Sequence, residues 1–140
     1  MQPYLYRTTD YGRTWQRLVG PETAGVRGYA HVVREDRVNP NVLYLGTEHG
    51  LFVSVNGGAS WAQFKPSNFP DGVAVRDIAL QPRTDDLVLA THGRGIWIID
   101  DVSPLRQLSA NVLASPVALL PGPPVEQRIQ GNGGWAEGDA

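Results

Sequence analysis

Short segments in which apolar and polar residues roughly alternate follow one another along most of the chain, and no segment shows a convincing helical period. Such alternation over about 4 to 8 residues is typical of strands with one buried face. The segments are separated by turn sequences such as Asn39-Pro40-Asn41 and Asn56-Gly57-Gly58, whose residue types suit the backbone angles of tight turns. We predict consecutive strands at residues 29–34, 42–47, 51–55 and 60–64.

One eight-residue pattern occurs twice in the first half of the chain. TTDYGRTW at residues 8–15 and SVNGGASW at residues 54–61 share a hydroxyl residue, Asp or Asn, Gly, a second hydroxyl residue and Trp at matching positions. A degenerate copy follows, because residues 80–100 parallel residues 38–55 but lack the Gly-x-Ser/Thr-Trp ending. Four short strands per unit, recurring at about 40 to 50 residues, are typical of β-propeller blades.

These units predict the fold class and its divisions. We expect an all-β chain, a partial β-propeller of four-stranded antiparallel blades followed by an irregular C-terminal tail. About two and a half blades are predicted, a partial one at 1–19, a complete one at 26–65 and a third at 73–120 whose outer strand is 116–120. Residues 121–140 are expected to be a linker or disordered. A β-sandwich would also contain many short strands, but the matched turns favour the propeller.

Composition narrows the possible functions. The formal net charge of −2 and the absence of Cys argue against a nucleic-acid partner, a disulfide scaffold and a thiolate metal site. No apolar run approaches the length of a membrane span, and the first residues lack the features of a signal peptide. The sequence contains no phosphate-binding loop with Lys and no His pair at metal-ligand spacing, so neither a cofactor nor a metal is predicted.

The eight-residue pattern has a structural interpretation. Asp10 can accept hydrogen bonds from backbone N–H groups further along the turn, and the amide oxygen of Asn56 can do the same. Gly12 permits the backbone angles of the turn. Each Trp offers a large apolar face for packing between sheets, so we predict that Trp15 and Trp61 are buried.

At these residues the chain resembles a known family. The pattern is similar to the Asp-box of bacterial neuraminidase repeats, with Asn56 standing where the box has Asp. Such boxes occur in sialidases, xyloglucanase-type glycosidases and sortilin-type propellers. The run ATHGRGIWIIDDVSPLRQL at residues 90–108 further resembles the end of the propeller in large secreted bacterial proteins described as sortilin-like or glycosyl-hydrolase-like. The residues with structural Asp-box roles are Thr8, Asp10, Gly12, Thr14, Trp15, Ser54, Asn56, Gly58, Ser60 and Trp61.

In four-stranded antiparallel blades, the Asp-box turns share one end of the sheets with the turns at 39–41 and 83–85. The opposite end carries the connections at 48–50 and 91–95, and propeller hydrolases bind ligands at that end near the channel. The resemblance therefore implies ligand-binding roles there for His49, His92, Arg94 and Arg76. The catalytic residues stay unknown, with Glu48 and Asp71 as a conceivable acid/base pair.

Each of these side chains also has a purely structural interpretation. His49 and His92 could cap strand connections, and Arg94 could hold loop carbonyls or a neighbouring carboxylate. His31 lies on a predicted inner strand and is expected to be satisfied there. The pair at 100–101 favours a strand-end turn over a calcium site, because two adjacent carboxylates lack a third ligand nearby.

Two functions from different classes remain open. The first is a binding or scaffolding module, a segment of a sortilin-like propeller that recognises peptide or glycan. The second is a fragment of a sialidase- or xyloglucanase-like glycoside hydrolase whose active site is completed by further blades. A closed propeller needs at least about four blades, so the expected partners are the remaining blades of a larger chain or copies of this one. The resemblance implies a secreted or periplasmic location.

Overall fold

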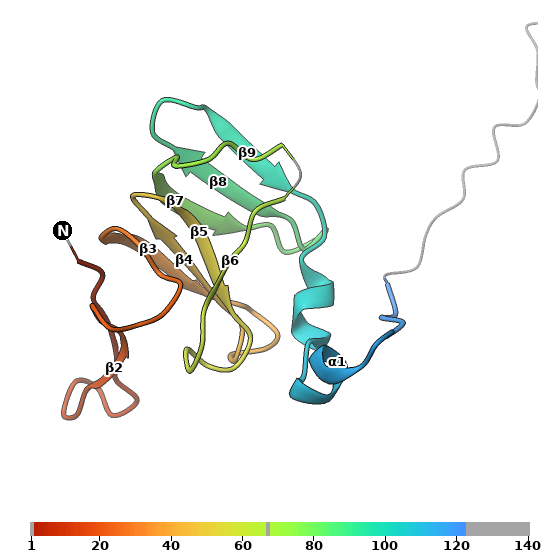
Figure 1. Ribbon diagram of the computed structural model, residues 1–140, viewed down its shortest axis with the longest axis horizontal. Coiled ribbons are helices and arrows are strands. Elements are labelled where there is room, and N and C mark those ends of the chain that lie inside the picture. The colour runs from red at the N-terminus through yellow and green to blue at the C-terminus, as the bar shows by residue number, and fades with distance from the viewer. Residues whose placement is uncertain (1, 67, 123–140) are drawn as a thin grey trace, which may run out of the picture.

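The computed structural model describes residues 2–66 and 68–122, and its strands form three antiparallel sheets that succeed one another along the chain (Figure 1). The prediction of an all-β fold is confirmed at this level. Of the predicted tail at 121–140, residues 123–140 lie outside the described residues. The first sheet contains β1 (Leu5–Arg7) and β2 (Gln16–Val19), the central sheet β3 (Ala30–Glu35), β4 (Leu43–Thr47), β5 (Gly50–Ser54) and β6 (Ala62–Gln63), and the third sheet β7 (Val75–Leu80), β8 (Leu87–Thr91) and β9 (Ile96–Ile99).

The central sheet is covered on both faces, and every residue of β4 and β5 is buried. Side chains alternate across a strand, so neighbouring residues of β4 enter different cores. Tyr44 joins Leu51 and Val53 in a core shared with the third sheet. Leu43 and Leu45 join a core shared with the first sheet. This two-sided burial explains the nearly continuous apolar run of β4.

Gly46 allows the central and third sheets to approach closely. A Cβ atom at this position would lie 2.7 Å from Cγ1 of Val32 and 2.7 Å from the carbonyl oxygen of Val75. Both distances are far shorter than ordinary carbon contacts of about 3.5 to 4.0 Å. The missing side chain therefore makes room for β7 beside β3 and β4.

The turn at residues 8–15 is held by side-chain bonds to its own backbone. The Thr8 hydroxyl accepts a bond from the N–H of Gly12 at 2.8 Å and donates to Oδ1 of Asp10 at 2.9 Å. Asp10 also accepts from the backbone N–H and the hydroxyl of Thr14, at 2.8 and 2.6 Å. The Trp15 indole N–H donates to the carbonyl of Gly12 at 3.1 Å. These bonds agree with the structural role predicted for the pattern.

The turn at residues 54–61 contains the corresponding bonds. Ser54 accepts from the N–H of Gly58 at 2.9 Å, and Oδ1 of Asn56 accepts from the N–H of Ser60 at 2.9 Å. Trp61 donates its indole N–H to the carbonyl of Gly58 at 3.1 Å. One bond has the opposite direction, because the Asn56 amide donates to the Ser60 hydroxyl at 2.8 Å. The hydroxyl at this position thus serves as donor to a carboxylate or as acceptor from an amide.

The two tryptophans differ in burial, and the prediction is right for only one of them. Trp61 is 7% exposed and packs in the core between the first and central sheets, whereas Trp15 is 62% exposed. Trp61 is covered by Val19 and Val26 of the preceding segment. Only residues 2–4 of the described chain precede β1, and they leave Trp15 exposed. The predicted burial of Trp15 is therefore wrong for this chain.

The third sheet has three strands, and the predicted outer strand at 116–120 is wrong. After β9 the chain enters a 3-10 helix, η1 (Ser103–Gln107), and then the short helix α1 (Ala110–Ala114). Ser109 caps α1 by accepting a bond from the N–H of Val112. Val102 and Leu105 pack against the core between the central and third sheets. This packing directs the chain away from the edge of β9.

Candidate ligand-binding site at the β4–β5 end of the sheets

A polar cluster at one end of the central and third sheets is centred on His31 of β3. Nε2 of His31 lies 2.9 Å from Oε2 of Glu48 in the β4–β5 turn. Nδ1 of His31 lies 3.3 Å from Nη1 of Arg76 on β7. The ring of Tyr29 meets the His31 ring edge-on, with 4.5 Å between centroids. We define Tyr29, His31, Glu48 and Arg76 as the His31 cluster.

The bond directions in the His31 cluster follow from the chemistry of its members. A guanidinium has only donors, so Nδ1 of His31 must accept from Arg76. Nε2 then carries the proton and donates to Glu48. The carboxylate fixes the orientation of the imidazole, and the imidazole in turn fixes Nη1 of Arg76. Arg76 is exposed, and its guanidinium makes no other hydrogen bond among the described residues, so the remaining N–H groups can be presented to solvent or to a ligand.

His31 and Arg76 occupy matching irregularities on two neighbouring strands. The pairing of β3 with β4 shifts between Ala30 and Val32, and that of β7 with β8 shifts between Val75 and Asp77. Each shift is a bulge, and the extra residue is His31 in one strand and Arg76 in the other. Bulges re-aim a side chain and are frequent near functional sites. Here they turn two polar side chains from adjacent sheets toward each other.

The carboxylate of Glu48 is held in its charged form. Hydrogen bonds from His31, and secondly from the Tyr29 hydroxyl, lower the pKa of Glu48 despite some burial. A general acid of a glycosidase needs a raised pKa, so that it carries a proton at neutral pH. Glu48 is therefore suited to orienting His31 rather than to donating a proton.

A second group of polar residues lines an open depression of about 400 Å³ at the same end of the sheets. His49 follows Glu48 in the β4–β5 turn, and Asp71 lies in the segment that leads to β7. The carboxylate of Asp71 is bound by the ammonium of Lys65, and the Asp71 side chain is 83% exposed. The lining residues are Arg27, His49, Gln63, Asp71 and Gly72.

The sequence-predicted site residues thus fall into separate groups. Glu48 and Arg76 meet in the His31 cluster, and His49 and Asp71 meet at the depression. His92 and Arg94 lie in the β8–β9 turn with exposed side chains. Their backbone groups hold that turn, since the N–H of His92 donates to Ala74 and the carbonyl of Arg94 accepts from the Trp97 indole. The structural interpretation therefore accounts for the backbones of His92 and Arg94. Their side chains are exposed and can still contact a ligand.

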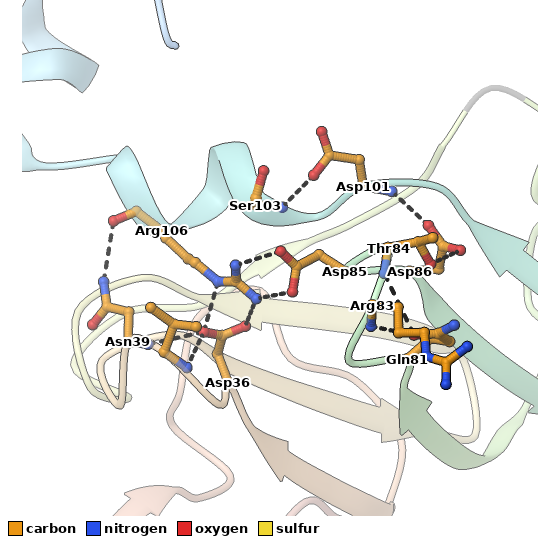
Figure 2. A network of polar contacts seen from close by, with 11 residues as sticks. Asp36, Asn39, Gln81, Arg83, Thr84, Asp85, Asp86, Asp101, Ser103 and Arg106 are labelled. Carbon is orange, nitrogen blue, oxygen red and sulfur yellow. Dashed lines mark hydrogen bonds and ion pairs between the residues drawn. The ribbon is translucent and has the colours of Figure 1, made fainter. Parts of the chain in front are cut away.

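Sequence reasoning missed the most extensive charged network, which lies at the opposite end of the sheets (Figure 2). Arg106 of η1 donates hydrogen bonds to the carboxylates of Asp36 and Asp85, one at each edge of its guanidinium. Nε and Nη2 donate to Asp36 at 2.8 and 3.1 Å, and Nη1 and Nη2 donate to Asp85 at 2.8 and 2.7 Å. Asn39 donates its amide to the carbonyl of Arg106 at 3.1 Å. The β3–β4 turn, the β7–β8 turn and η1 are joined in this way.

The network has the electrostatics of a structural clamp. Burial alone would raise the pKa of Asp36, but the bonds from Arg106 and from the N–H groups of Asn39 and Val38 lower it overall. The bonds from Arg106 likewise lower the pKa of Asp85, and the two carboxylates raise the pKa of Arg106. Nothing in the sequence pairs these residues, because they come from three separate segments.

Sequence comparisons do not identify a family for this chain. No protein-family model matches the chain, and no curated protein matches it significantly. In the part of the chain that the structure describes, no group of three or more His, Asp or Glu side chains is arranged to hold a metal ion. Within that same part, no helix is both long and apolar enough to span a bilayer.

Proposed function

We propose that this chain is a segment of an Asp-box β-propeller, sortilin-like in type, that acts outside the cytoplasm as a binding or scaffolding module for peptide or glycan. The observation that carries the proposal is the pair of bulges that aims His31 and Arg76 at each other beside an open polar depression. A guanidinium fixed at one N–H and free at others is a good receptor for carboxylate or hydroxyl groups of either ligand.

The geometry favours binding over glycoside hydrolysis. Glu48 bonds to His31 and has a lowered pKa, and Asp71 is exposed and bound by Lys65. Glu48 thus lacks the raised pKa of a general acid, and Asp71 lacks the enclosed surroundings that such an acid needs. If the hydrolase alternative is correct, Glu48→Gln abolishes cleavage of a glycan while leaving its binding intact.

The exposed faces of the outer sheets support the propeller. Ile96 and Ile98 of β9 are 73% and 59% exposed on the face of the third sheet turned away from the core. Tyr6 is 49% exposed and Trp15 62% exposed on the first sheet. Apolar faces of this kind are surfaces for further sheets. The sheets that cover them belong either to a longer chain or to other copies of this one.

A binding screen followed by a matched pair of variants tests the function. The labelled chain is applied to peptide and glycan arrays, and the best ligand is then titrated. We expect Arg76→Gln to weaken binding about tenfold or more, because a hydrogen bond to a charged group is lost. Arg83→Gln is the control, since Arg83 is an exposed arginine in the β7–β8 turn at the other end of the sheets. Absence of any bound peptide or glycan, or equal losses in both variants, would exclude the proposed site.

Light scattering and circular dichroism on one sample test the assembly. A folded, discrete oligomer would indicate that copies complete one another. A monomer with a weak β signal would indicate that the chain needs the remaining blades of a longer protein, and the binding experiment would then be made on that protein.

A further inference from the structure

The outer edge of β9 is open, and the central sheet shows what occupies the corresponding edge. In the central sheet, β6 pairs with β5 on the side opposite β4. The third sheet ends at β9 within the described residues, because the chain turns into η1 at that point. Ser54 faces Leu43 and Ile99 faces Leu87, so β9 occupies in the third sheet the place that β5 has in the central one.

The unpaired backbone groups of β9 can be identified from the register. The N–H of Thr91 donates to Gly95, and bonding and non-bonding pairs alternate along an antiparallel ladder. Trp97 and Ile99 therefore bond to β8, and the N–H and C=O groups of Ile96 and Ile98 point to the open edge. In β5 the residue corresponding to Ile96 is Leu51, whose carbonyl accepts the N–H of Phe64 at 2.9 Å. The same carbonyl of Ile96 has no such strand beside it among residues 2–66 and 68–122.

The sequence of β9 favours pairing of this edge with another strand. Its residues are IWII, and an exposed apolar edge strand without Pro, Lys or a bulge is a template for pairing with another chain. A depression of about 370 Å³ runs beside it and is lined by Phe69 and by Trp97 to Asp100, among others. Phe69 and Trp97 meet edge-on at 5.4 Å between ring centroids, and both pack with the core between the central and third sheets.

We propose that β9 binds an extended peptide of a partner protein, which adds to the third sheet as a fourth strand in the manner of β6. Peptides commonly bind in this way, with main-chain bonds giving affinity and alternate side chains giving specificity. Residues facing Ile98 and Ile96 are apolar, as Ala62 and Phe64 are in the central sheet. By extension of the register, the residue facing Asp100 corresponds to Ser60, and a basic side chain there complements the carboxylate. This inference stands on the three-stranded sheet and does not require the proposed function.

The probe is a capped peptide with the sequence ASWAQFK, copied from residues 59–65. It is titrated into the full 140-residue chain while amide NMR shifts and amide exchange are followed. The amides of Ile96 and Ile98 should shift and become protected, and those of Trp97 and Ile99 should change less. Replacing Ser by Arg in the peptide (Ser60→Arg) should tighten binding roughly 1.5- to 5-fold.

Two blocking experiments give the proposal independent tests. N-methylation of the Phe in the peptide removes the donor that corresponds to Phe64, and it should weaken binding roughly tenfold without touching the protein. Ile98→Pro removes an outward N–H while sparing the ladder to β8, and Ile98→Val is its control. Equal binding of the methylated and unmethylated peptides would overturn the proposal, as would shifts at β2 or β6 instead of β9. Protection of Ile96 and Ile98 before peptide is added would also overturn it, because the edge would already be covered by the chain itself or by a second copy.

Discussion

Arg106 follows β9 at the same number of residues as Trp61 follows β5, counted from strand residues that pair in the same way. Ser54 pairs with Leu43 and Ile99 pairs with Leu87, which makes the segments that follow β5 and β9 comparable. The backbone agrees, since Gly57 donates to Asn41 and Val102 donates to Asp85. Trp61 closes its turn through apolar packing, and Arg106 closes the later turn through two carboxylates. Matching sequence positions after β5 and β9 thus make two different kinds of interaction.

Replacing Arg106 should destabilise the fold strongly. The Asp36 side chain is fully buried, and Arg106→Ala would leave its carboxylate with backbone donors only. Breaking a buried pair on one side costs about 3 to 5 kcal/mol, and the remaining N–H donors place the expected loss near the lower end. Urea denaturation gives the free energy of unfolding. Asp85→Asn is the milder comparison, because the Asp85 side chain is 36% exposed; a smaller loss in R106A than in D85N would contradict the clamp.

Removing the Tyr44 hydroxyl should not harm the protein and should stabilise it. Tyr44 is fully buried, and its hydroxyl has no hydrogen-bond partner among the described residues. Burial raises its pKa and leaves an unsatisfied polar atom in the core. Such an atom costs about 1 to 3 kcal/mol, so Tyr44→Phe should raise the free energy of unfolding by about 1 kcal/mol. A loss of stability in thermal and urea denaturation would show that the hydroxyl has a partner, such as an ordered water.

The two tryptophans should respond differently to truncation. Trp61→Ala removes a side chain that is 7% exposed, and large-to-small changes of this kind cost about 3 to 5 kcal/mol. Trp15→Ala removes one that is 62% exposed and should cost less than about 1 kcal/mol. Acrylamide quenching would report the exposure directly in variants that keep only Trp15 or only Trp61 and replace the other tryptophans. If Trp15 is as protected as Trp61, then another sheet, from a second copy or from elsewhere, covers it in solution.

The central sheet could be predicted from the sequence because its signals are local. Alternation located the strands at 29–34, 42–47 and 51–55 to within one residue of β3, β4 and β5, and the turn chemistry located the bonds of Asp10 and Asn56. The burial of Trp15 was not predictable in the same way, since it depends on whether a neighbouring sheet is present. Residues 116–120 are apolar enough for a strand, but the packing of Val102 and Leu105 leads the chain elsewhere.

The site was predicted only in part, for a related reason. Strand order placed Glu48, His49, Asp71 and Arg76 at one end of the sheets, and the structure brings them into two groups there. Predicting the contact between His31 and Arg76 requires the bulges, and a bulge leaves no clear mark in one sequence. The contact between Arg106 and Asp36 joins distant segments and depends on the path of η1, which no local pattern specifies.

Acid should weaken the first turn and spare the second. Hydrogen bonds from Thr14, with a smaller contribution from Thr8, lower the pKa of Asp10 to about 2. An unfolded Asp has a pKa of about 3.9, so the charged form stabilises the fold above that pH, and this contribution is lost as the pH falls from about 4 to about 2. Asn56 occupies the matching position in the second turn and does not titrate.

The reciprocal variants test this difference. Asp10→Asn should behave like the second turn, keeping its stability at neutral pH and losing the acid-dependent part. Asn56→Asp should gain an acid-dependent part in the same pH range. The urea midpoint is measured at pH 7 and pH 3, and NMR titration of the Asp10 carboxyl gives its pKa. Equal acid sensitivity in the wild type and in D10N would assign the effect to other carboxylates.

The close approach of the central and third sheets at Gly46 should be intolerant of a single methyl group. A Cβ at residue 46 would lie 2.7 Å from Cγ1 of Val32 and from the carbonyl oxygen of Val75, and the carbonyl belongs to a strand that cannot move alone. Overpacking of this kind costs about 1 to 3 kcal/mol, so Gly46→Ala should lower the free energy of unfolding by that amount. It should also separate β7 from β3 and β4, which would disturb the Arg76–His31 contact. Gly122→Ala is the control, because no atom lies within 4 Å of its added Cβ. Chemical denaturation measures stability, and the side-chain NMR signals of His31 report the contact; an unchanged His31 signal together with unchanged stability would show that the two sheets adjust freely at this point.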